Sequence, residues 1–297
     1  LKDKDIDLLK AKYPMIEWIT DLGLRFDADV IMAMPGTLKP ELFDQFKHLK
    51  WVQLLSAGYD TLDQPYLKRR GIILSNAPDV YSIAIAEDVF SKILLFNRNL
   101  KGYLDQMKTG AWKNIHVSHE ICESTVGIIG AGSIGKEIAK RMKAFGARVL
   151  GYKRTYEKID HFDAIFTDRE GLEEIYRQSD YMIVTLPSSS ETKHLIDWNA
   201  FKLMKSNAMF INVSRGDVVV QEALVQALKD QKIRAAALDV MVPEPLPQDH
   251  ELWKMGNVFI TPHNSIGSPN TAKRLLEVLE GSLNRYLEGE PLPNRIC

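Results

Sequence analysis

Short apolar runs alternate with amphipathic stretches along nearly the whole chain. In the first third, apolar runs of strand length lie at residues 16–19, 30–33, 52–55 and 72–74. Consecutive strands separated by amphipathic helices are typical of a parallel sheet, because parallel strands need a crossover connection. The first part of the chain is therefore predicted to form a small α/β domain.

A second set of strands follows a long helical segment at residues 79–100. A polar stretch that runs through Trp112 and contains Gly102 and Gly110 comes next. Most of the later strands are apolar on both faces, as expected for a parallel sheet that helices cover on both sides. They lie at residues 126–129, 148–152, 181–186, 208–213, 235–240 and 258–261.

The last helical pattern, at residues 269–287, is expected to return the chain to the first domain. We place the crossing between the domains near Arg98. The predicted fold class is α/β with two domains of parallel sheet. The first domain is expected to be discontinuous, with residues 1–98 and 266–297, and the second to span residues 99–265.

Composition narrows the classes of function. The chain of 297 residues is 45% hydrophobic and 26% charged, which excludes a disordered or collagen-like protein. Lysine and arginine number 38 and aspartate and glutamate 39, so the formal net charge is −1. This balance gives no electrostatic reason to expect binding to nucleic acid or to an anionic membrane.

The chain carries no targeting or metal-binding pattern. No apolar run approaches the roughly 18 to 20 residues of a membrane-spanning helix. The opening stretch LKDKDIDLLK has charges where a signal peptide needs an apolar core. Cys122 and Cys297 have neither metal-site spacing nor a disulfide framework, so we expect a cytoplasmic protein without a metal. Leu1 is not an initiating methionine, and a short N-terminal piece is expected to be missing.

A glycine-rich loop directly follows the strand at residues 126–129 and opens a helix. Gly130, Gly132 and Gly135 have the spacing GxGxxG. In that arrangement the first glycine allows a tight turn, the second lets a pyrophosphate approach the backbone, and the third permits close helix packing. Ser133 and Ile134 begin the helix, whose free amides and dipole favour a phosphate. The alternative is a tight turn without a ligand, but the complete strand, loop and helix favour a dinucleotide.

The end of the next strand indicates which dinucleotide binds. An NAD site has a carboxylate there for the ribose hydroxyls, but this chain has Lys153, Arg154 and Thr155. A guanidinium and a neighbouring ammonium match the charge of a 2′-phosphate. We therefore expect NADP to be preferred, with NAD possible. The alternative is a solvated basic turn in which Glu157 or Asp160 serves the ribose.

Three further polar residues follow three later strands. Arg215 comes after the strand at 208–213, Glu244 after that at 235–240, and His263 after that at 258–261. In a parallel sheet these ends share one edge with the glycine loop. An arginine can bind a carboxylate and polarise a ketone, a histidine can deliver a proton, and a nearby glutamate favours the protonated imidazole. The alternative is a purely structural network.

Several stretches together resemble the D-isomer-specific 2-hydroxyacid dehydrogenases, in the same order and spacing. They are QLLSAGYDTLD, VGIIGAGSIG, LPSSSETKHLI, INVSRGDVV, ALDVMVPEPLP and VFITPHNS. The resemblance covers about residues 50–290. It implies two Rossmann-like domains, the discontinuous substrate domain being flavodoxin-like, with the active site in the cleft between them and usually a homodimer.

The resemblance also implies residue roles. Arg215 would orient the substrate, His263 would be the acid-base and Glu244 its partner. Asp239 would face the nicotinamide carboxamide. Leu186, Pro187 and Val213 would complete the cofactor contacts, and Ala57 and Gly58 would offer backbone amides to the substrate carboxylate. For SAGYD, a simple tight turn is the alternative.

Lys153 stands where the family usually has an acid, which resembles its NADP-using glyoxylate and hydroxypyruvate reductase branch. Two other departures are noted: Asp88 follows AIAE where the family often has histidine, and the usual opening strand is absent. The expected function is NADPH-dependent reduction of a small 2-oxo acid to the D-2-hydroxy acid. The alternatives are a bulkier 2-oxo acid and an NAD(P)-sensing binding protein similar to the family's corepressors. Formate oxidation is disfavoured because it goes with glutamine at the position of Glu244.

Overall fold

The computed structural model describes residues 2–20, 26–117 and 119–297, and the chain divides into two compact units. The first unit comprises Leu1–Tyr81 and Ser268–Cys297, and the second Ser82–Gly267. The first unit is therefore discontinuous in sequence. The boundary at Ser82 differs from the one expected near Arg98, because the intervening helix packs in the second unit.

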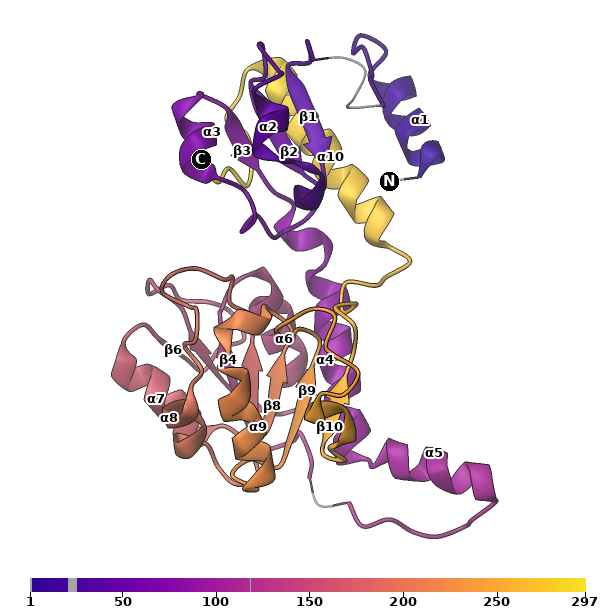
Figure 1. Cartoon of the computed structure of the whole chain (residues 1–297), viewed down its shortest axis with the longest axis vertical. Helices are drawn as coiled ribbons and strands as arrows, with labels where there is room; N and C mark the ends of the chain where they lie inside the picture. Colours follow the sequence, from indigo (N-terminus) through magenta and orange to yellow (C-terminus); the bar gives the residue numbers. More distant parts are fainter. Residues whose placement is uncertain (1, 21–25, 118) are drawn as a thin grey trace. The chain divides into compact units, whose positions relative to one another are not determined.

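The first unit contains a three-stranded parallel sheet in the order β1-β2-β3 (Figure 1). Its core gathers apolar residues from all three strands and from the helices around them, with Val52, Leu54 and Leu74 completely buried. The elements are α1 (Asp3–Lys12), β1 (Val30–Ala33), η1 (Pro35–Thr37), α2 (Pro40–Phe43), β2 (Trp51–Leu54), α3 (Gln64–Arg69), β3 (Ile73–Ser75), η2 (Pro78–Val80) and α10 (Thr271–Glu288).

The strand predicted at residues 16–19 is wrong. Residues 16–19 form a turn and coil after α1, where the Ile16 amide and the Trp18 indole N–H both donate to the carbonyl of Tyr13. Both bonds tie the segment back to the end of α1 in a turn instead of an extended strand.

The carboxyl-terminal helix α10 belongs to the first unit through specific contacts. The Tyr13 hydroxyl donates to Asn284 Oδ1 at 2.8 Å, and the rings of Trp51 and Tyr286 lie 5.1 Å apart. The last residues run beside β3, because the Ile296 amide donates to the Leu74 carbonyl at 2.7 Å. These contacts explain why the chain returns to this unit at its end.

The second unit is built on a seven-stranded parallel sheet in the order β10-β9-β8-β7-β4-β5-β6. Six of the strands lie where the sequence predicts them, whereas the edge strand β6 was not predicted. The elements are α4 (Ser82–Asn97), α5 (Leu100–Thr109), β4 (Thr125–Ile129), α6 (Ser133–Ala144), β5 (Arg148–Tyr152), β6 (Ala164–Phe166), α7 (Arg169–Gln178), β7 (Tyr181–Val184), α8 (Trp198–Leu203), β8 (Met209–Asn212), η3 (Gly216–Val218), α9 (Gln221–Lys229), β9 (Ala235–Leu238), η4 (Glu251–Lys254) and β10 (Val258–Ile260).

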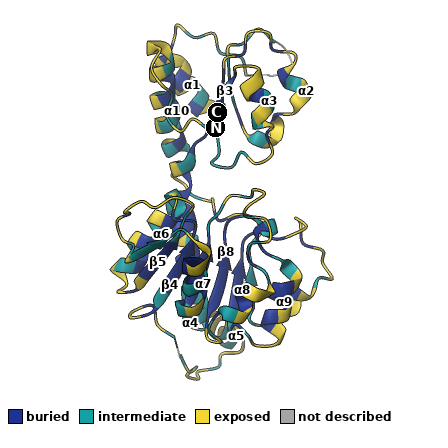
Figure 2. Cartoon of the chain, turned by 90° about the vertical axis from the view of Figure 1, so that its left-hand side faces the viewer, coloured by how far each residue is buried: buried dark blue, intermediate teal, exposed yellow. Residues whose placement is uncertain are grey.

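Helices cover this sheet, and the central strands are buried on both faces (Figure 2). Helices α4 and α6 pack together, and the rings of Phe90 and Phe145 lie 5.1 Å apart. Helices α7, α8 and α9 form a second packed group. The strands β4 to β6 follow one another in one direction across the sheet, and β7 to β10 follow one another in the opposite direction. Because crossovers are right-handed, the two groups of helices lie on opposite faces of the sheet. The predicted α/β fold with parallel sheets is confirmed.

The segment predicted as a polar stretch after α4 contains a helix, α5. Asn99 caps it by accepting a hydrogen bond from the Gly102 amide, and Gly110 ends it at φ +66°. A Cβ at Gly102 would lie 2.7 Å from the Asn99 Oδ1 atom, so glycine is required for this cap. No helix in the described ranges is both long and apolar enough to cross a membrane.

Candidate active site

The predicted site residues of the second unit follow strands whose carboxyl ends share one edge of the sheet. Strand β4 pairs in parallel with β5 on one side and with β7 on the other, so the strand order reverses beside β4. The crevice at such a reversal is where open α/β sheets bind their ligands. This edge carries the loops that follow the strands with predicted site residues: β4, β5, β7, β8, β9 and β10.

The glycine loop has the geometry of a phosphate cradle. Gly130 has φ +115°, and a Cβ there would lie 2.9 Å from the Thr185 backbone. A Cβ at Gly135 would lie 2.4 Å from the Gly130 carbonyl oxygen, so this contact between loop and helix requires glycine. A Cβ at Gly132 would meet nothing within 4 Å, which leaves open space at the turn.

Helix α6 begins directly after this open turn. Its first intrahelical hydrogen bond runs from the Lys136 amide to the Gly132 carbonyl, so the amides of Ser133, Ile134 and Gly135 have no acceptor within the helix. Free amides beside open space suit a pyrophosphate. The loop is also tied to β5, because the Gly130 and Ala131 amides donate to the Tyr152 carbonyl. The residues present therefore fit a dinucleotide.

The basic turn after β5 carries its own carboxylate. Lys153 forms an ion pair with Glu157, and the Lys136 Nζ lies 4.0 Å from the same carboxyl group. The hydrogen bond from Lys153 and the charge of Lys136 lower the pKa of Glu157. Arg154 and Thr155 are exposed. The sequence predicted Lys153 as a phosphate partner, but it did not reveal this pairing.

The loops after β7 and β8 are held by hydrogen bonds. Leu186 is half-buried and Pro187 exposed, and the Pro187 carbonyl accepts a bond from Thr192 Oγ1 at 2.7 Å. Val213 is buried, and its amide donates to the Val184 carbonyl at 3.3 Å. These three predicted cofactor residues therefore lie at the same edge of the sheet as the glycine loop.

Arg215 is presented by a rigid turn. The Asn212 side chain accepts from the Ser214 amide and donates to the Arg215 carbonyl, and Arg215 Nη1 donates to the Ser214 carbonyl. A Cβ at Gly216 would lie 2.3 Å from the backbone of Met241, so the loop after β8 packs tightly against the loop after β9. This contact brings the Arg215 turn beside the loop that carries Glu244.

His263 and Glu244 form a pair. The His263 Nδ1 lies 2.8 Å from Glu244 Oε2, and Glu244 Oε1 accepts from the Met241 amide at 3.1 Å. The two side chains are 43% and 37% exposed, so a substrate can reach the imidazole. His263 has φ +49°, an uncommon conformation for a residue with a side chain.

Asp239 is completely buried beneath the His263 loop. Its Oδ1 accepts from the Asn264 amide and its Oδ2 from the Ser265 amide, both at 3.0 Å. Thr261 Oγ1 also donates to Oδ1. Burial alone would raise the pKa of Asp239, but these hydrogen bonds outweigh it and the pKa lies below its usual value.

The sequence does not predict the buried lysine that lies near Asp239. Lys92 on α4 lies 3.9 Å from Asp239 and forms an ion pair with Asp88. The departure from the family at Asp88 was the available signal, because Lys92 follows it by one helical turn, and a carboxylate at this spacing can compensate a buried ammonium.

Ala57 and Gly58 lie in the first unit, after β2. Asn76 Nδ2 donates to the Ala57 carbonyl at 2.7 Å, and Ser56 Oγ donates to the Gly58 carbonyl at 3.0 Å. Within the described part of the chain, neither amide donates to a protein acceptor. The turn is thus fixed through its carbonyls while its amides are available for a ligand.

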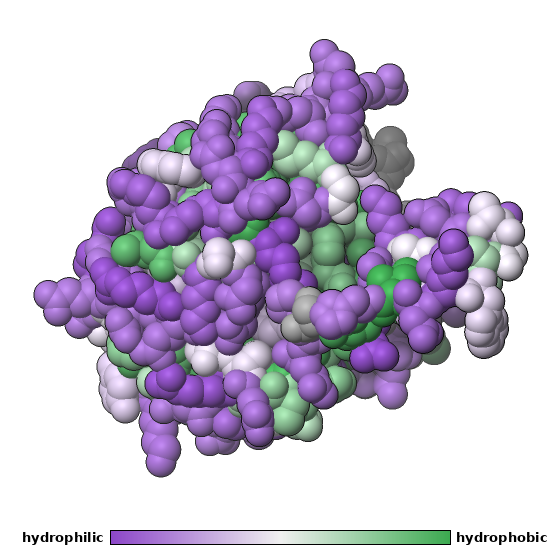
Figure 3. All heavy atoms as spheres, turned by 90° about the horizontal axis from the view of Figure 1, so that it is seen from below, coloured by the Kyte–Doolittle hydropathy of each residue, from purple (hydrophilic) through white to green (hydrophobic). Residues whose placement is uncertain are grey.

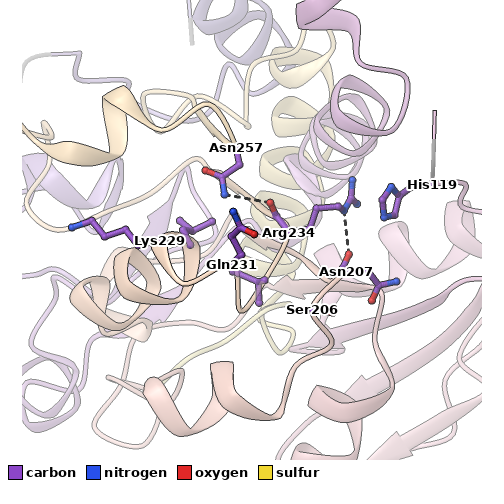
Figure 4. Close-up of a pocket in the computed structure, with 9 residues that line it drawn as sticks. His119, Ser206, Asn207, Lys229, Gln231, Arg234 and Asn257 are labelled. Carbon is purple, nitrogen blue, oxygen red and sulfur yellow. Dashed lines mark hydrogen bonds between the residues drawn. The ribbon is translucent and has the colours of Figure 1, made fainter. Parts of the chain in front are cut away.

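A groove lies at the opposite edge of the sheet, at the amino ends of the strands (Figure 4). Arg234 Nε donates to the Asn207 carbonyl, and Asn257 Nδ2 donates to the Arg234 carbonyl. None of the predicted site residues lines this groove. The lining residues are His119, Ser206, Asn207, Leu228, Lys229, Gln231, Ile233, Arg234 and Asn257.

A glycine cradle at the strand-order reversal and a histidine-carboxylate pair at the same sheet edge define a dinucleotide-dependent dehydrogenase. Residues 90–265 match the model of the D-isomer specific 2-hydroxyacid dehydrogenase, NAD binding domain. The chain belongs to this family, whose members are NAD(P)-dependent oxidoreductases.

Similar proteins support this assignment over the full length. A glyoxylate reductase of Thermococcus gammatolerans is 33% identical, covering 100% of this chain and 93% of that one. The human glyoxylate reductase/hydroxypyruvate reductase is 36% identical over 84% of this chain and 77% of its own. A family protein from Aeromonas salmonicida superposes with a TM-score of 0.87 at 32% identity, covering 99% and 95% of the two chains. The prediction of two Rossmann-like domains is confirmed.

Proposed function

We propose that this protein reduces a small 2-oxo acid of the glyoxylate or hydroxypyruvate type to the D-2-hydroxy acid with NADPH. The observation that carries the proposal is the His263–Glu244 pair, 2.8 Å apart, at the sheet edge that holds the glycine cradle. The identities to two named glyoxylate reductases support a small substrate.

The residues of the chain divide the reaction between them. The bound cofactor supplies a hydride to the carbonyl carbon. Protonated His263 donates a hydrogen bond to Glu244 from Nδ1, which leaves Nε2 to deliver the proton to the carbonyl oxygen. Arg215 binds the carboxylate and polarises the carbonyl. The free amides of Ala57 and Gly58 suit a carboxylate as well. Hydride and proton together convert the ketone or aldehyde to the alcohol.

Preference for NADPH rests on the turn after β5. Arg154 is exposed and Thr155 adjoins it, so both can bind a 2′-phosphate. Lys153 and Lys136 add positive charge, while Glu157 neutralises part of it. Gly130, Gly132 and Gly135 with the α6 amides hold the pyrophosphate, and Leu186, Pro187 and Val213 complete the cofactor site. The buried carboxylate of Asp239 supports the His263 loop instead of contacting the cofactor.

We also propose a cytoplasmic homodimer. Both cysteines are free, which suits a reducing compartment. Helix α5 buries none of its residues, and apolar side chains along it and just beyond it are exposed, Met107 by 76% and Trp112 by 100%. Figure 3 shows this end of the second unit, where apolar residues lie in a recess among hydrophilic ones. Such a face is stabilised when a second copy covers it.

The test is a screen of NADPH and NADH oxidation with glyoxylate, hydroxypyruvate, pyruvate, phenylpyruvate and 2-ketopantoate. Glyoxylate and hydroxypyruvate with NADPH are expected to give the highest kcat/KM. His263→Asn should lower kcat by about 10²- to 10⁴-fold, the usual contribution of a general acid. His48→Asn, at an exposed histidine of the first unit, is the control and should match the wild type. Turnover of none of these acids, or a bulky acid reduced best, would contradict the proposal.

A further inference from the structure

Helix α4 carries a lysine at a completely buried position. Lys92 is 0% exposed, between the buried residues Val89 and Ile93. A buried ammonium is strongly unfavourable unless carboxylates compensate it. Two do so: Asp88, one turn earlier on α4, and Asp239, at the end of β9, whose Oδ1 lies 3.9 Å from the Lys92 Nζ. Two carboxylates and one ammonium leave this cluster with a net charge of −1.

Asp239 links this cluster to the loop that carries His263. Its carboxylate accepts hydrogen bonds from Thr261, Asn264 and Ser265, on both sides of the histidine. Its backbone carbonyl accepts from the His263 amide at 2.8 Å. These bonds hold His263 at φ +49°, which costs conformational energy unless the surroundings enforce it. The ionised carboxylate is required, because a protonated carboxyl group gives up acceptor capacity.

The two acids of the cluster differ in their preference for a proton. Burial raises the pKa of Asp88 even though Lys92 opposes this effect. For Asp239, burial is outweighed by hydrogen bonds from Ser265, Thr261 and the loop amides, so its pKa is lowered. Asp239 is thus the member that stays ionised, and the ammonium of Lys92 is the cation buried beside it.

We propose that Lys92 is a positioning residue for hydride transfer: its buried ammonium keeps Asp239 ionised, and ionised Asp239 holds the loop that presents His263. The inference rests on the proposed function in one respect, that His263 is the proton donor. Lys92 itself is too deeply buried to touch a substrate.

The test compares three variants, D88N, D88N/K92M and D88N/K92R. If Lys92 alone were replaced, both Asp88 and Asp239 would lose their cation. With Asp88 changed to asparagine first, Asp239 is the one carboxylate of the cluster that the second substitution affects. In D88N the ammonium still faces Asp239, in D88N/K92M it is replaced by an apolar chain of similar length, and in D88N/K92R a cation is retained. Melting temperatures establish that each variant is folded. Should D88N/K92M fail to fold, D88N/K92Q takes its place with the same expectation.

We expect D88N/K92M to have a kcat at least about tenfold below that of D88N at the acid end of the pH range in which both variants stay folded, because Asp239 takes up a proton more readily without the neighbouring ammonium. The deficit should shrink as the pH rises, because Asp239 then ionises without help. KM and the Kd for NADPH should stay within about threefold, and D88N/K92R, which keeps a cation at position 92, should retain the activity of D88N. Equal kcat at every pH, or D88N/K92R as defective as D88N/K92M, would overturn the inference.

A second measurement separates this inference from the proposed function. The imidazole resonances of His263 in the cofactor-free protein, identified by their absence in H263N, should shift in D88N/K92M but not in D88N/K92R. If these resonances move while the wild type reduces no 2-oxo acid, the positioning role stands and the proposed function fails. If the wild type turns over and neither kcat nor the resonances differ between variants, the positioning role fails alone.

Discussion

The imidazole of His263 and the carboxylate of Glu244 lie 2.8 Å apart, although they follow different strands of the sheet. Glu244 is fixed by the Met241 amide, and His263 by its own amide bond to the Asp239 carbonyl. Each partner is therefore oriented by backbone before a ligand binds. Such preorganisation is what general acid catalysis requires of its donor.

Replacing Glu244 by glutamine should lower kcat about 10- to 100-fold, because a neutral amide stabilises the protonated imidazole less than a carboxylate does. The NADPH Kd should be unchanged. Steady-state kinetics and fluorescence titration measure the two quantities. Glu251→Gln removes an exposed carboxylate paired with Lys229 and is the control. A Glu244→Gln enzyme with wild-type kcat would show that the pair is structural.

The glycines of the cradle are expected to respond differently to alanine. Gly135→Ala places a methyl group 2.4 Å from the Gly130 carbonyl oxygen and should destabilise the fold. Gly132→Ala meets nothing within 4 Å, so the melting temperature should be kept while the space for a pyrophosphate is reduced and the NADPH Kd rises. Thermal unfolding and titration separate the two effects. Unchanged NADPH binding in folded Gly132→Ala would place the phosphates elsewhere.

Much of the fold follows from periodicity. The strands of the second unit were predicted because each is a continuous apolar run between helices. Strand β6 was missed since Ala164–Phe166 has three residues, all half-buried at a sheet edge. Helix α5 was missed because Gly102 lowers its helix propensity and Gly110 follows directly after it, and its stability depends on the Asn99 cap.

The site shows the same limit. Arg215, Glu244 and His263 could be placed on one edge because parallel strands fix where their ends lie. The burial of Lys92 could not be predicted, because a lysine in a helix usually faces water and its second ion-pair partner, Asp239, is 147 positions away. Likewise the ion pair of Lys153 with Glu157 depends on how the turn after β5 folds back.

Arg154→Ser should raise the Kd for NADPH about 10- to 100-fold, the loss expected for one or two charge-assisted hydrogen bonds to phosphate. The Kd for NADH should change little. Arg177→Ala, at an exposed arginine of α7, is the control. An equal rise in the Kd for NADPH and the Kd for NADH would show that Arg154 does not bind the 2′-phosphate.

The alternative for this turn is tested by Glu157→Gln. If Glu157 serves the ribose, this change weakens NADH binding. If it merely neutralises Lys153, the change strengthens NADPH binding and leaves NADH unaffected, which is the result we expect.

Asp180 should make the free energy of unfolding depend on pH in the acid range. Burial would raise its pKa, but hydrogen bonds from the Thr125 amide and Lys205 lower it below the ordinary 3.8. Because the folded pKa is the lower one, the stabilisation is complete above 3.8 and is lost as the pH falls through the folded pKa. Asp180→Asn should reduce the free energy of unfolding by about 1 to 3 kcal/mol at neutral pH.

Urea unfolding of the wild type and Asp180→Asn between neutral pH and about pH 3 measures this difference. The gap between the two proteins should close on the acid side. A gap that stays constant with pH would mean that the charge of Asp180 does not stabilise the fold.

Transfer of the cofactor's hydrogen to the substrate carbon tests the central claim most directly. The wild type is incubated with glyoxylate and NADPH deuterated at either face of the nicotinamide C4, and the glycolate is analysed by mass spectrometry. One of the two deuterated cofactors is predicted to place deuterium on the carbon that bears the new hydroxyl group. Oxidation of the cofactor that yields no deuterated glycolate from either one would contradict the account.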